Sequence, residues 1–227
     1  MRTRKRLLLI LGAGSSLDCG MPSVGAIDDL MRWWAQSYAA RVGSADYFAL
    51  AWEALERRSA QGFRSGRSPV NFERALSDLV ALMHWLRPSP EGSALRHLVG
   101  APAVPPLSFP HPNGYGPYLD IKAMVAHLLA QLAAEMRARC RRLVADSPGM
   151  VAWRAVLDAL RARFDVVIYN LNYDTVALSC WPDAFTGFDV DGRFDPGAVY
   201  RRDWEGVFHL HGSVHLSLAE PVGERMV

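Results

Sequence analysis

The chain has 227 residues, of which 50% are hydrophobic and 21% are charged, with a net charge of +2. This composition is typical of a globular protein and suffices for one large domain or two small ones. A charge so close to neutral gives no electrostatic basis for direct binding of nucleic acid. No apolar run approaches the roughly 20 residues of a membrane-spanning helix, and Leu7–Leu11 is too short for the core of a signal peptide. We therefore expect a cytoplasmic protein without membrane association.

Three cysteines, Cys19, Cys140 and Cys180, are scattered along the chain without a Cys-x-x-Cys pair. An odd number at such spacing argues against a disulfide scaffold and against a cysteine-rich zinc ribbon. The pattern fits a reducing compartment.

The first apolar run, Leu7–Leu11, is continuous and aliphatic, which predicts a strand buried on both faces of a parallel sheet. Apolar residues then recur at helical spacing through much of the chain. We expect helices over Val24–Tyr38, Tyr47–Arg58, Asn71–Leu86, Tyr118–Val144 and from Pro148 to Leu160, with an irregular connection over 102–117. The interval 24–163 is therefore expected to form a large, mainly helical insertion.

Two further apolar runs predict strands at Phe164–Tyr169 and Val207–Leu210, with a short helix at Thr175–Ser179 and loops or hairpin strands over Pro182–Tyr200. Strands separated by helices favour an α/β fold, here a Rossmann-like parallel sheet. A doubly wound nucleotide domain usually needs further β-α units after its last catalytic group, and only 214–227 remain. We therefore expect the sheet to be truncated at the C-terminus and the chain to belong to a longer protein.

Each predicted strand ends at small or polar residues, at the edge of the sheet where α/β proteins bind ligands. Gly12–Ser16 (Gly-Ala-Gly-Ser-Ser) follows the first strand and precedes a helix, as a phosphate-binding loop does. Its glycines would let the backbone approach a pyrophosphate, although Leu17 stands where the usual dinucleotide motif has a third glycine. A tight strand-to-helix turn that needs small residues explains the segment equally well.

The second segment, Asn170–Asp174, carries an amide at Asn172 and a carboxylate at Asp174. On one side of a turn the two groups could orient a ribose, a water molecule or a nicotinamide amide. The alternative is an Asx turn in which Asp174 caps the next helix, and for this segment alone it is the favoured interpretation.

The third segment, His209–Ser213, is expected to place two histidines on one face of a strand. His211 comes last before a glycine at the predicted sheet edge, where a neutral imidazole could accept a proton from a ribose hydroxyl. The alternative is a zinc site of His209, His211 and His215, although no carboxylate or cysteine lies in ligand spacing nearby.

Taken together, these segments resemble the Sir2-like (sirtuin-type) NAD-binding superfamily. That family has, in order, a Gly-Ala-Gly-x-Ser loop, a Gly-x-Pro, an Asn-x-Asp turn and a Leu-His-Gly. The matching residues here are Gly12–Ser16, Gly20–Pro22, Asn172–Asp174 and Leu210–Gly212. The motifs cover both ends of the chain but not its helical middle.

Features of the protein deacylases in this superfamily are missing. Their Gly-x-Pro is followed by Asp-Phe-Arg, where this chain has Ser23-Val24-Gly25, and Leu171 replaces the glutamine before the asparagine. The zinc-ribbon cysteines that follow His-Gly in the deacylases are absent. The resemblance is therefore to the bacterial Sir2-like proteins of anti-phage defence, which hydrolyse NAD to ADP-ribose and nicotinamide.

This resemblance implies NAD as the substrate and no zinc. It implies that Asn172 orients the attacking water and the nicotinamide ribose, and that His211 acts as general base or polarises the ribose hydroxyls. The residues implied to bind NAD are Gly12, Ala13, Gly14, Ser15, Ser16, Pro22, Asp174, Gly212 and Ser213. The reaction passes through an oxocarbenium-like centre, so the protein mainly supplies orientation and electrostatics.

Two other functions stay open. One is an NAD-dependent protein deacylase or ADP-ribosyltransferase of the same superfamily, and the other is a non-catalytic domain that binds NAD or ADP-ribose and regulates an attached effector. The expected partners are NAD, a C-terminal or separately encoded sensor or effector, and further copies of the chain in a homo-oligomer.

Overall fold

The computed structural model describes residues 4–60, 70–86, 117–188, 193–197 and 205–216. The predicted connection over 102–116 and the residues from 217 onward, on which the expected truncation partly rests, lie outside these ranges. The chain divides into two compact units. The sheet unit comprises Met1–Ser23 and Ala133–Val227, and the helical unit comprises Val24–Leu132.

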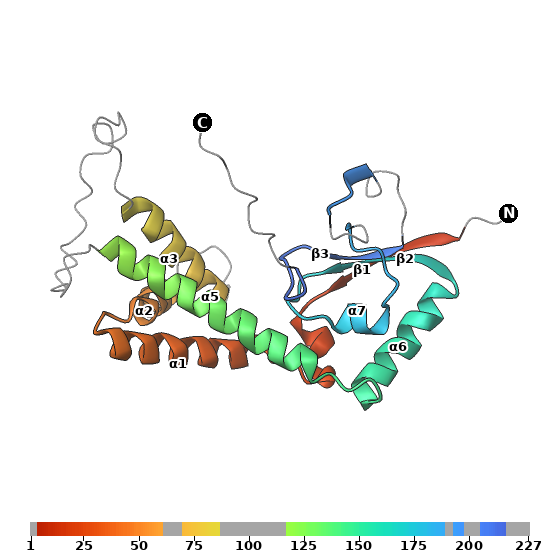
Figure 1. Cartoon of the computed structure of the whole chain (residues 1–227), viewed down its shortest axis with the longest axis horizontal. Helices are drawn as coiled ribbons and strands as arrows, with labels where there is room; N and C mark the ends of the chain where they lie inside the picture. The colour runs from red at the N-terminus through yellow and green to blue at the C-terminus, as the bar shows by residue number, and fades with distance from the viewer. Residues whose placement is uncertain (1–3, 61–69, 87–116, 189–192, 198–204, 217–227) are drawn as a thin grey trace. The chain divides into compact units, whose positions relative to one another are not determined.

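The sheet unit is built on three parallel strands in the order β1-β2-β3. They span Lys5–Leu11, Phe164–Asn170 and Gly206–His209 (Figure 1). β1 pairs with β2 along its whole length, up to the pair Leu11↔Asn170, and Asn170 in turn pairs with His209. The predicted Rossmann-like α/β fold with a helical insertion is therefore confirmed, and the three strands end level with one another.

One face of the sheet carries the core of this unit. The 3₁₀ helix η1 (Ala13–Cys19) and the helices α6 (Pro148–Arg161) and α7 (Val176–Cys180) lie on this side (Figure 1). The side chains of Val166, Ile168 and Val207 are 0% exposed. Burying a side chain of this size contributes about 1.5–3 kcal/mol to the free energy of folding.

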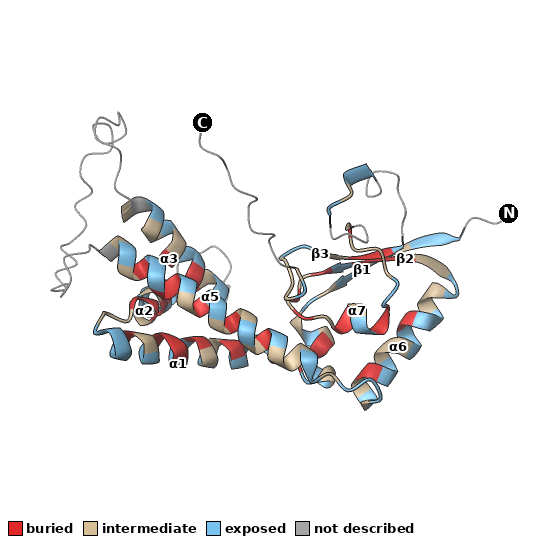
Figure 2. Ribbon diagram, viewed as in Figure 1, coloured by how far each residue is buried: buried red, intermediate tan, exposed pale blue. Residues whose placement is uncertain are grey.

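The opposite face of β1 is open. Leu8 is 44% exposed and Ile10 is 65% exposed, as is 37% of Tyr169, which pairs with Ile10 across the sheet (Figure 2). The prediction that the first strand is buried on both faces was therefore wrong. The physical reason is that β1 is the edge strand of the described sheet, and η1, α6 and α7 all pack on the other side.

The helical unit packs around a core of aliphatic and aromatic side chains. It contains α1 (Val24–Val42), α2 (Tyr47–Ala60), α3 (Phe72–Leu86) and the part of α5 (Pro117–Arg141) up to Leu132. Its fully buried side chains include Met31, Phe48, Leu79, Ile121, Met124 and Leu128. The last helix of the predicted insertion, α6, packs instead on β2 and η1, so the compact helical unit is shorter than the interval 24–163.

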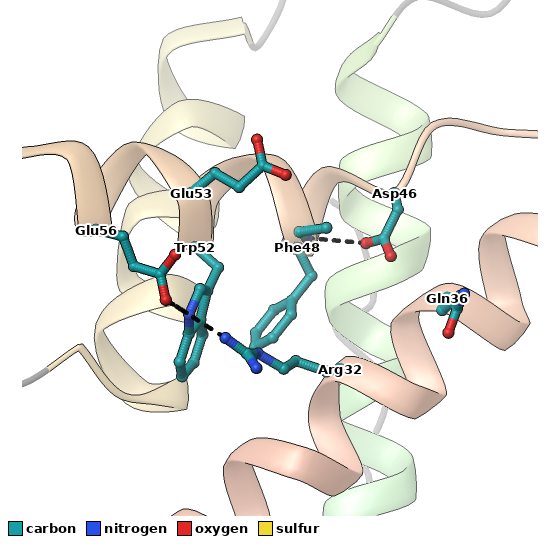
Figure 3. Close-up of a pocket in the computed structure, with 8 residues that line it drawn as sticks. Arg32, Gln36, Asp46, Phe48, Trp52, Glu53 and Glu56 are labelled. Atoms are coloured by element: carbon teal, nitrogen blue, oxygen red, sulfur yellow. Dashed lines mark hydrogen bonds and ion pairs between the residues drawn. The ribbon is translucent and has the colours of Figure 1, made fainter.

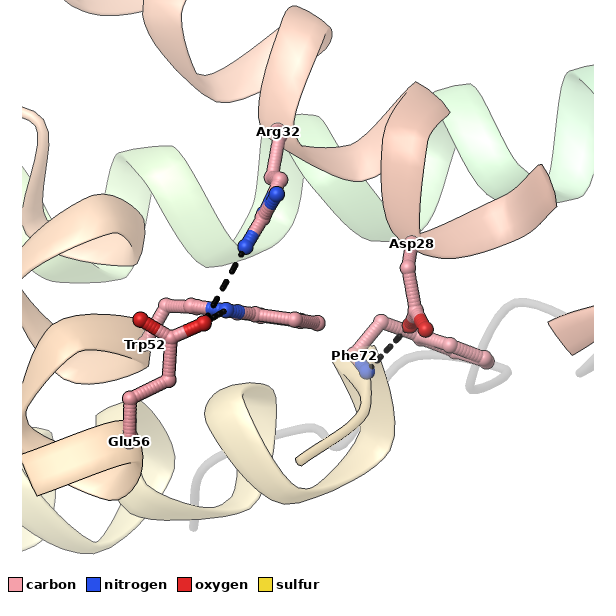
Figure 4. A network of polar contacts seen from close by, with 5 residues as sticks. All are labelled: Asp28, Arg32, Trp52, Glu56 and Phe72. Carbon is pink, nitrogen blue, oxygen red and sulfur yellow. Dashed lines mark hydrogen bonds and ion pairs between the residues drawn. The ribbon is translucent and has the colours of Figure 1, made fainter. Parts of the chain in front are cut away.

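Polar contacts join the first three helices of the helical unit (Figure 4). The backbone N–H of Phe72, the first residue of α3, donates to Asp28 Oδ1 of α1 at 2.7 Å. The indole Nε1–H of Trp52 donates to Glu56 Oε1 at 2.7 Å, and the guanidinium of Arg32 lies 4.2 Å from the centre of the Trp52 ring. The carboxylate of Asp28 therefore satisfies an N–H that the start of a helix leaves without an intrahelical partner.

The predicted helices and strands are all present, with ends that differ by a few residues. α5 ends at Arg141 rather than Val144, and the last strand ends at His209 rather than Leu210. The described part of Pro182–Tyr200 holds an antiparallel bridge, Phe188↔Phe194, as expected of a loop with short hairpin pairing. Among the described helices, none combines the length and the apolar character that crossing a membrane requires.

Candidate functional site

The carboxyl ends of the three strands lie side by side, because Leu11, Asn170 and His209 are paired in register. The ladder continues one step further. The N–H of Leu171 donates to the Leu11 carbonyl oxygen at 2.9 Å, and the N–H of Leu210 donates to that of Asn170 at 3.0 Å. The three polar segments predicted from the sequence therefore emerge together, and we call this region the carboxyl edge. It is the edge at which open α/β sheets bind ligands.

The glycine-rich segment forms η1 directly after β1. Gly12 is the N-cap, and its carbonyl oxygen accepts hydrogen bonds from the N–H of Ser15 at 2.9 Å and from the Ser15 hydroxyl at 2.8 Å. The helix ends at Cys19, and its C-cap is Gly20, whose φ of +87° lies in the left-handed region that glycine adopts without steric cost. The sequence does not predict this 3₁₀ helix, because a run of glycine and serine carries no apolar period.

The fold of the loop itself does not require glycine at Gly12 or Gly14. Gly12 has an extended backbone with φ −118° and ψ −179°, and Gly14 is not among the described glycines with positive φ. A Cβ built on either residue meets no atom of the described chain within 4 Å. The backbone therefore faces open space at both positions, which is the condition that a phosphate-binding loop needs for close approach of its ligand.

Asn172 joins the second segment to this loop. Its side chain is 7% exposed. Its Nδ2 lies 3.0 Å from the Gly12 carbonyl oxygen, and 3.2 and 3.0 Å from the hydroxyl oxygens of Ser15 and Ser16. Its backbone N–H donates to Asn170 Oδ1 at 3.0 Å. Because an amide NH₂ has only two hydrogens, the three acceptors share them, and the predicted catalytic asparagine lies against the predicted phosphate loop.

Asp174 is 2% exposed and is held by two hydrogen bonds. Its Oδ1 accepts the N–H of Val176 at 2.9 Å, and the Ser16 side chain also hydrogen-bonds to its carboxylate. Burial raises the pKa of Asp174, while the hydrogen bonds from Val176 and Ser16 oppose that rise. The bond to Val176 is the one expected of an Asx turn, although the N-cap of α7 is Thr175.

The third segment does not have the predicted arrangement. β3 ends at His209 and His211 lies in the following turn, so the prediction that the two histidines share a strand face was wrong. His211 is exposed and makes no hydrogen bond to the described part of the chain. The turn continues through Gly212, with φ +81°. The Ser213 hydroxyl then donates to the Tyr173 carbonyl oxygen at 3.1 Å, which fastens the third segment to the second.

His209 is half-buried between the second and third segments. Its Nδ1 lies 3.3 Å from the Asn172 carbonyl oxygen and 3.5 Å from Asn170 Nδ2. Its ring meets that of His215 edge to face, with 4.8 Å between the ring centres. Burial lowers the pKa of His209, and the hydrogen bond with Asn172 opposes that change. Sequence reasoning gave His209 only a place in the zinc alternative, because the predicted strand ran on to Leu210 and the pairing of His209 with Asn170 depends on the fold.

The remaining predicted residue, Pro22, is buried next to η1. The N–H of Met21 before it donates to the Ser16 carbonyl oxygen at 3.2 Å. For the zinc alternative, the described residues hold no group of three or more His, Cys, Asp or Glu side chains placed to bind a metal.

A pocket of about 380 Å³ lies between α1 and α2 of the helical unit (Figure 3). It is lined by Arg32, Gln36, Asp46, Phe48, Ala49, Trp52, Glu53 and Glu56. Asp46 Oδ1 accepts the N–H of Ala49 at 2.9 Å, and Glu56 Oε1 lies 3.5 Å from Arg32 in addition to its bond with Trp52. These charged groups are therefore engaged in contacts within the unit, and the carboxyl edge is the stronger candidate site.

Comparison of the chain with protein-family models, with curated proteins and with solved structures finds no match. Function is therefore inferred from the residues and geometry of the carboxyl edge.

Proposed function

We propose that the chain is a Sir2-like NAD hydrolase that cleaves NAD to ADP-ribose and nicotinamide at the carboxyl edge. The observation that carries the proposal is the position of Asn172, whose amide is bound to the glycine loop while Gly12 and Gly14 face open space. A pyrophosphate held along Gly12–Ser16 would place the rest of the nucleotide beside Asn172. The order of the four short motifs supports the same assignment.

The reaction breaks the bond between C1′ of the ribose and the nicotinamide nitrogen, which takes the electron pair as it leaves. A water oxygen then bonds to C1′, and its proton is released. Asn172 Oδ1 takes no hydrogen bond from the described chain, so it is available to orient that water or a ribose hydroxyl. In this proposal His211, which is exposed on the adjoining turn, accepts a proton. The site otherwise supplies orientation and electrostatic stabilisation of the oxocarbenium-like centre.

The other predicted binding residues have supporting roles in this proposal. Ala13, Ser15 and Ser16 belong to η1 and form the pyrophosphate loop with the two glycines. Asp174 fixes the turn that carries Asn172, and Ser213 fastens the His211 turn to Tyr173. We further propose that the chain serves as the effector of an anti-phage system that arrests the infected cell by draining NAD, with a sensor on the same polypeptide or from a separate gene.

Nicotinamide release from NAD tests the proposed function. We expect Asn172→Ala and His211→Ala each to lower the turnover number by about 100-fold or more, as losses of orienting and general-base groups do. Gln36→Ala, at an exposed position in the helical unit, is the matched control and should turn over NAD as the wild type does. Equal nicotinamide release by the wild type and both site variants would refute the residue assignment.

The same assay separates the alternatives. Nicotinamide release that depends on an added acylated peptide would support a deacylase instead. Tight NAD binding without nicotinamide release, with the triggering partner present, would support a regulatory NAD-binding domain.

A further inference from the structure

The contacts of His209 assign its tautomer. The Asn172 carbonyl oxygen, 3.3 Å from Nδ1, can only accept a hydrogen bond. The Asn170 amide, 3.5 Å from the same nitrogen, is turned with its Oδ1 toward the Asn172 N–H and presents its Nδ2 donor. We assign the hydrogen to Nδ1, because this satisfies the shorter contact and leaves the longer one without a hydrogen bond.

The other ring nitrogen of His209 has no partner. Nε2 is buried from solvent and makes no hydrogen bond within the described part of the chain. As an unprotonated acceptor it is tolerated, but a protonated ring would bury a charged N–H without an acceptor, which is far more costly. A buried Nε2 also cannot reach a ligand on the surface, so His209 is not placed to act as the catalytic base.

We propose that neutral His209 is a positioning residue of the carboxyl edge, whose Nδ1–H bond to the Asn172 carbonyl oxygen holds the Asn172 amide against the glycine loop. Protonation at Nε2 keeps the Nδ1–H donor but buries a charged N–H without an acceptor, so it releases the hold only by driving the ring out of its buried position. For its activity readout the inference rests on the proposed NAD hydrolysis, whereas the hydrogen bond and its response to acid can be measured without NAD.

The surroundings of His209 favour the neutral ring. The groups that face it are the amide of Asn170 at the end of β2, the carbonyl of Asn172 in the segment after β2, and the ring of His215 from the turn after β3. His215 is itself engaged with the Ser213 hydroxyl, 2.7 Å from its Nδ1. No carboxylate of the described chain forms an ion pair with His209 that would favour a charged ring.

Two substitutions at His209 separate the hydrogen bond from the ring. In His209→Asn an amide Nδ2 replaces the Nδ1–H donor and cannot titrate, whereas His209→Leu removes the donor. At about pH 8, where histidine is neutral, we expect His209→Leu to lower kcat about tenfold or more, with a smaller change in KM, because Asn172 is misplaced. His209→Asn should stay within about threefold of the wild type, because it keeps the hydrogen bond.

The control is His84→Asn on the exposed side of α3, which also removes a histidine and should leave kcat unchanged. Wild-type kcat in His209→Leu, or an equal loss in His209→Leu and His209→Asn, would overturn the inference.

Nuclear magnetic resonance of the ¹⁵N-labelled chain without NAD provides the second readout. We expect an Nδ1–H tautomer at His209 and a pKa below the usual value for histidine, because the ring is buried. The Asn172 side-chain amide signals should move together with His209. An Nε2–H tautomer, or Asn172 side-chain amide signals that do not change as His209 titrates, would contradict the inference. Because this measurement needs no NAD, it decides on His209 even if the wild type proves inactive and the proposed function fails.

Discussion

At Gly14 the absence of a side chain has no explanation within the chain, since its φ is not positive and a Cβ would meet open space. The same holds for Gly12. Under the proposed function, a ligand that approaches the backbone would supply this reason, and it can be tested separately from folding.

We expect Gly14→Ala to fold with wild-type stability, within about 0.5 kcal/mol, and to lose NAD turnover by about tenfold or more, because a methyl group projects toward the pyrophosphate. Unfolding by denaturant and nicotinamide release measure the two quantities. The matched control is Gly43→Ala in the helical unit, where φ is +70°. It should cost about 1 kcal/mol of stability and leave turnover unchanged. Full NAD turnover by Gly14→Ala would show that the glycine loop does not bind the pyrophosphate.

The ionisation of buried Asp174 makes the stability of the fold depend on pH. Burial raises its pKa, so the folded protein keeps this proton to higher pH than the unfolded chain does. Between the two pKa values the folded state binds more protons, and its stability falls as pH rises through that interval.

The variant Asp174→Asn cannot ionise, and its Oδ1 can still accept the Val176 N–H. We therefore expect its free energy of unfolding to rise relative to the wild type as pH increases from about 4 to about 7. Urea unfolding at several pH values measures the difference. A difference that shrinks with rising pH would show that the charged carboxylate stabilises the fold.

The residue roles are also where sequence reasoning reached its limit. The motifs singled out Asn172, and the structure places it beside the glycine loop. They could not show that β3 ends at His209, because strand ends depend on pairing with a neighbour far away in the sequence. The contact between His209 and Asn172 was therefore invisible until the fold was known.

At the scale of elements, η1 is held by a close approach of α6. A Cβ on Gly149, in the first turn of α6, would lie 2.2 Å from the Asp18 carbonyl oxygen. The Cβ is fixed rigidly to the α6 backbone and the oxygen belongs to the η1 backbone, so neither can move aside without shifting a helix. The glycine therefore allows α6 to support the segment that forms the candidate phosphate loop.

We expect Gly149→Ala to lower the free energy of unfolding by about 1–3 kcal/mol, as overpacking does, and to reduce NAD turnover because η1 is displaced. Ala152→Ser, on the exposed surface of the same helix, should stay within about 0.5 kcal/mol. Thermal or urea unfolding provides the comparison. Unchanged stability of Gly149→Ala would show that α6 and η1 lie farther apart than the structure describes.

The exposure of Leu8 and Ile10 on β1 gives another paired prediction. Ile168→Ala, at a side chain that is 0% exposed, should cost about 2–5 kcal/mol. Ile10→Ala, at a side chain that is 65% exposed, should cost less than about 1 kcal/mol. Equal losses would mean that the open face of β1 is covered in solution.

The elements themselves were largely predictable, because apolar periodicity marks helices such as α3 and aliphatic runs mark β1 and β2. Two features were not. The 3₁₀ helix over Ala13–Cys19 carries no apolar period, and the exposure of Ile10 depends on the edge position of β1 rather than on its composition.

At the scale of the whole molecule, every residue of the candidate site lies in the sheet unit, although the site draws on both ends of the chain. The helical unit, with its own pocket at Trp52, contributes none of them. We therefore expect ligand binding to change the chemical shifts of the sheet unit and not those of the helical unit.

Chemical-shift mapping of the ¹⁵N-labelled chain during titration with ADP-ribose tests this account most directly. We predict shifts concentrated at Gly12–Ser16, Leu171–Asp174 and Leu210–Ser213, with the signals of Trp52 and Arg32 unchanged. Shifts centred on the pocket of the helical unit, or no shifts at the carboxyl edge at saturating ADP-ribose, would contradict it.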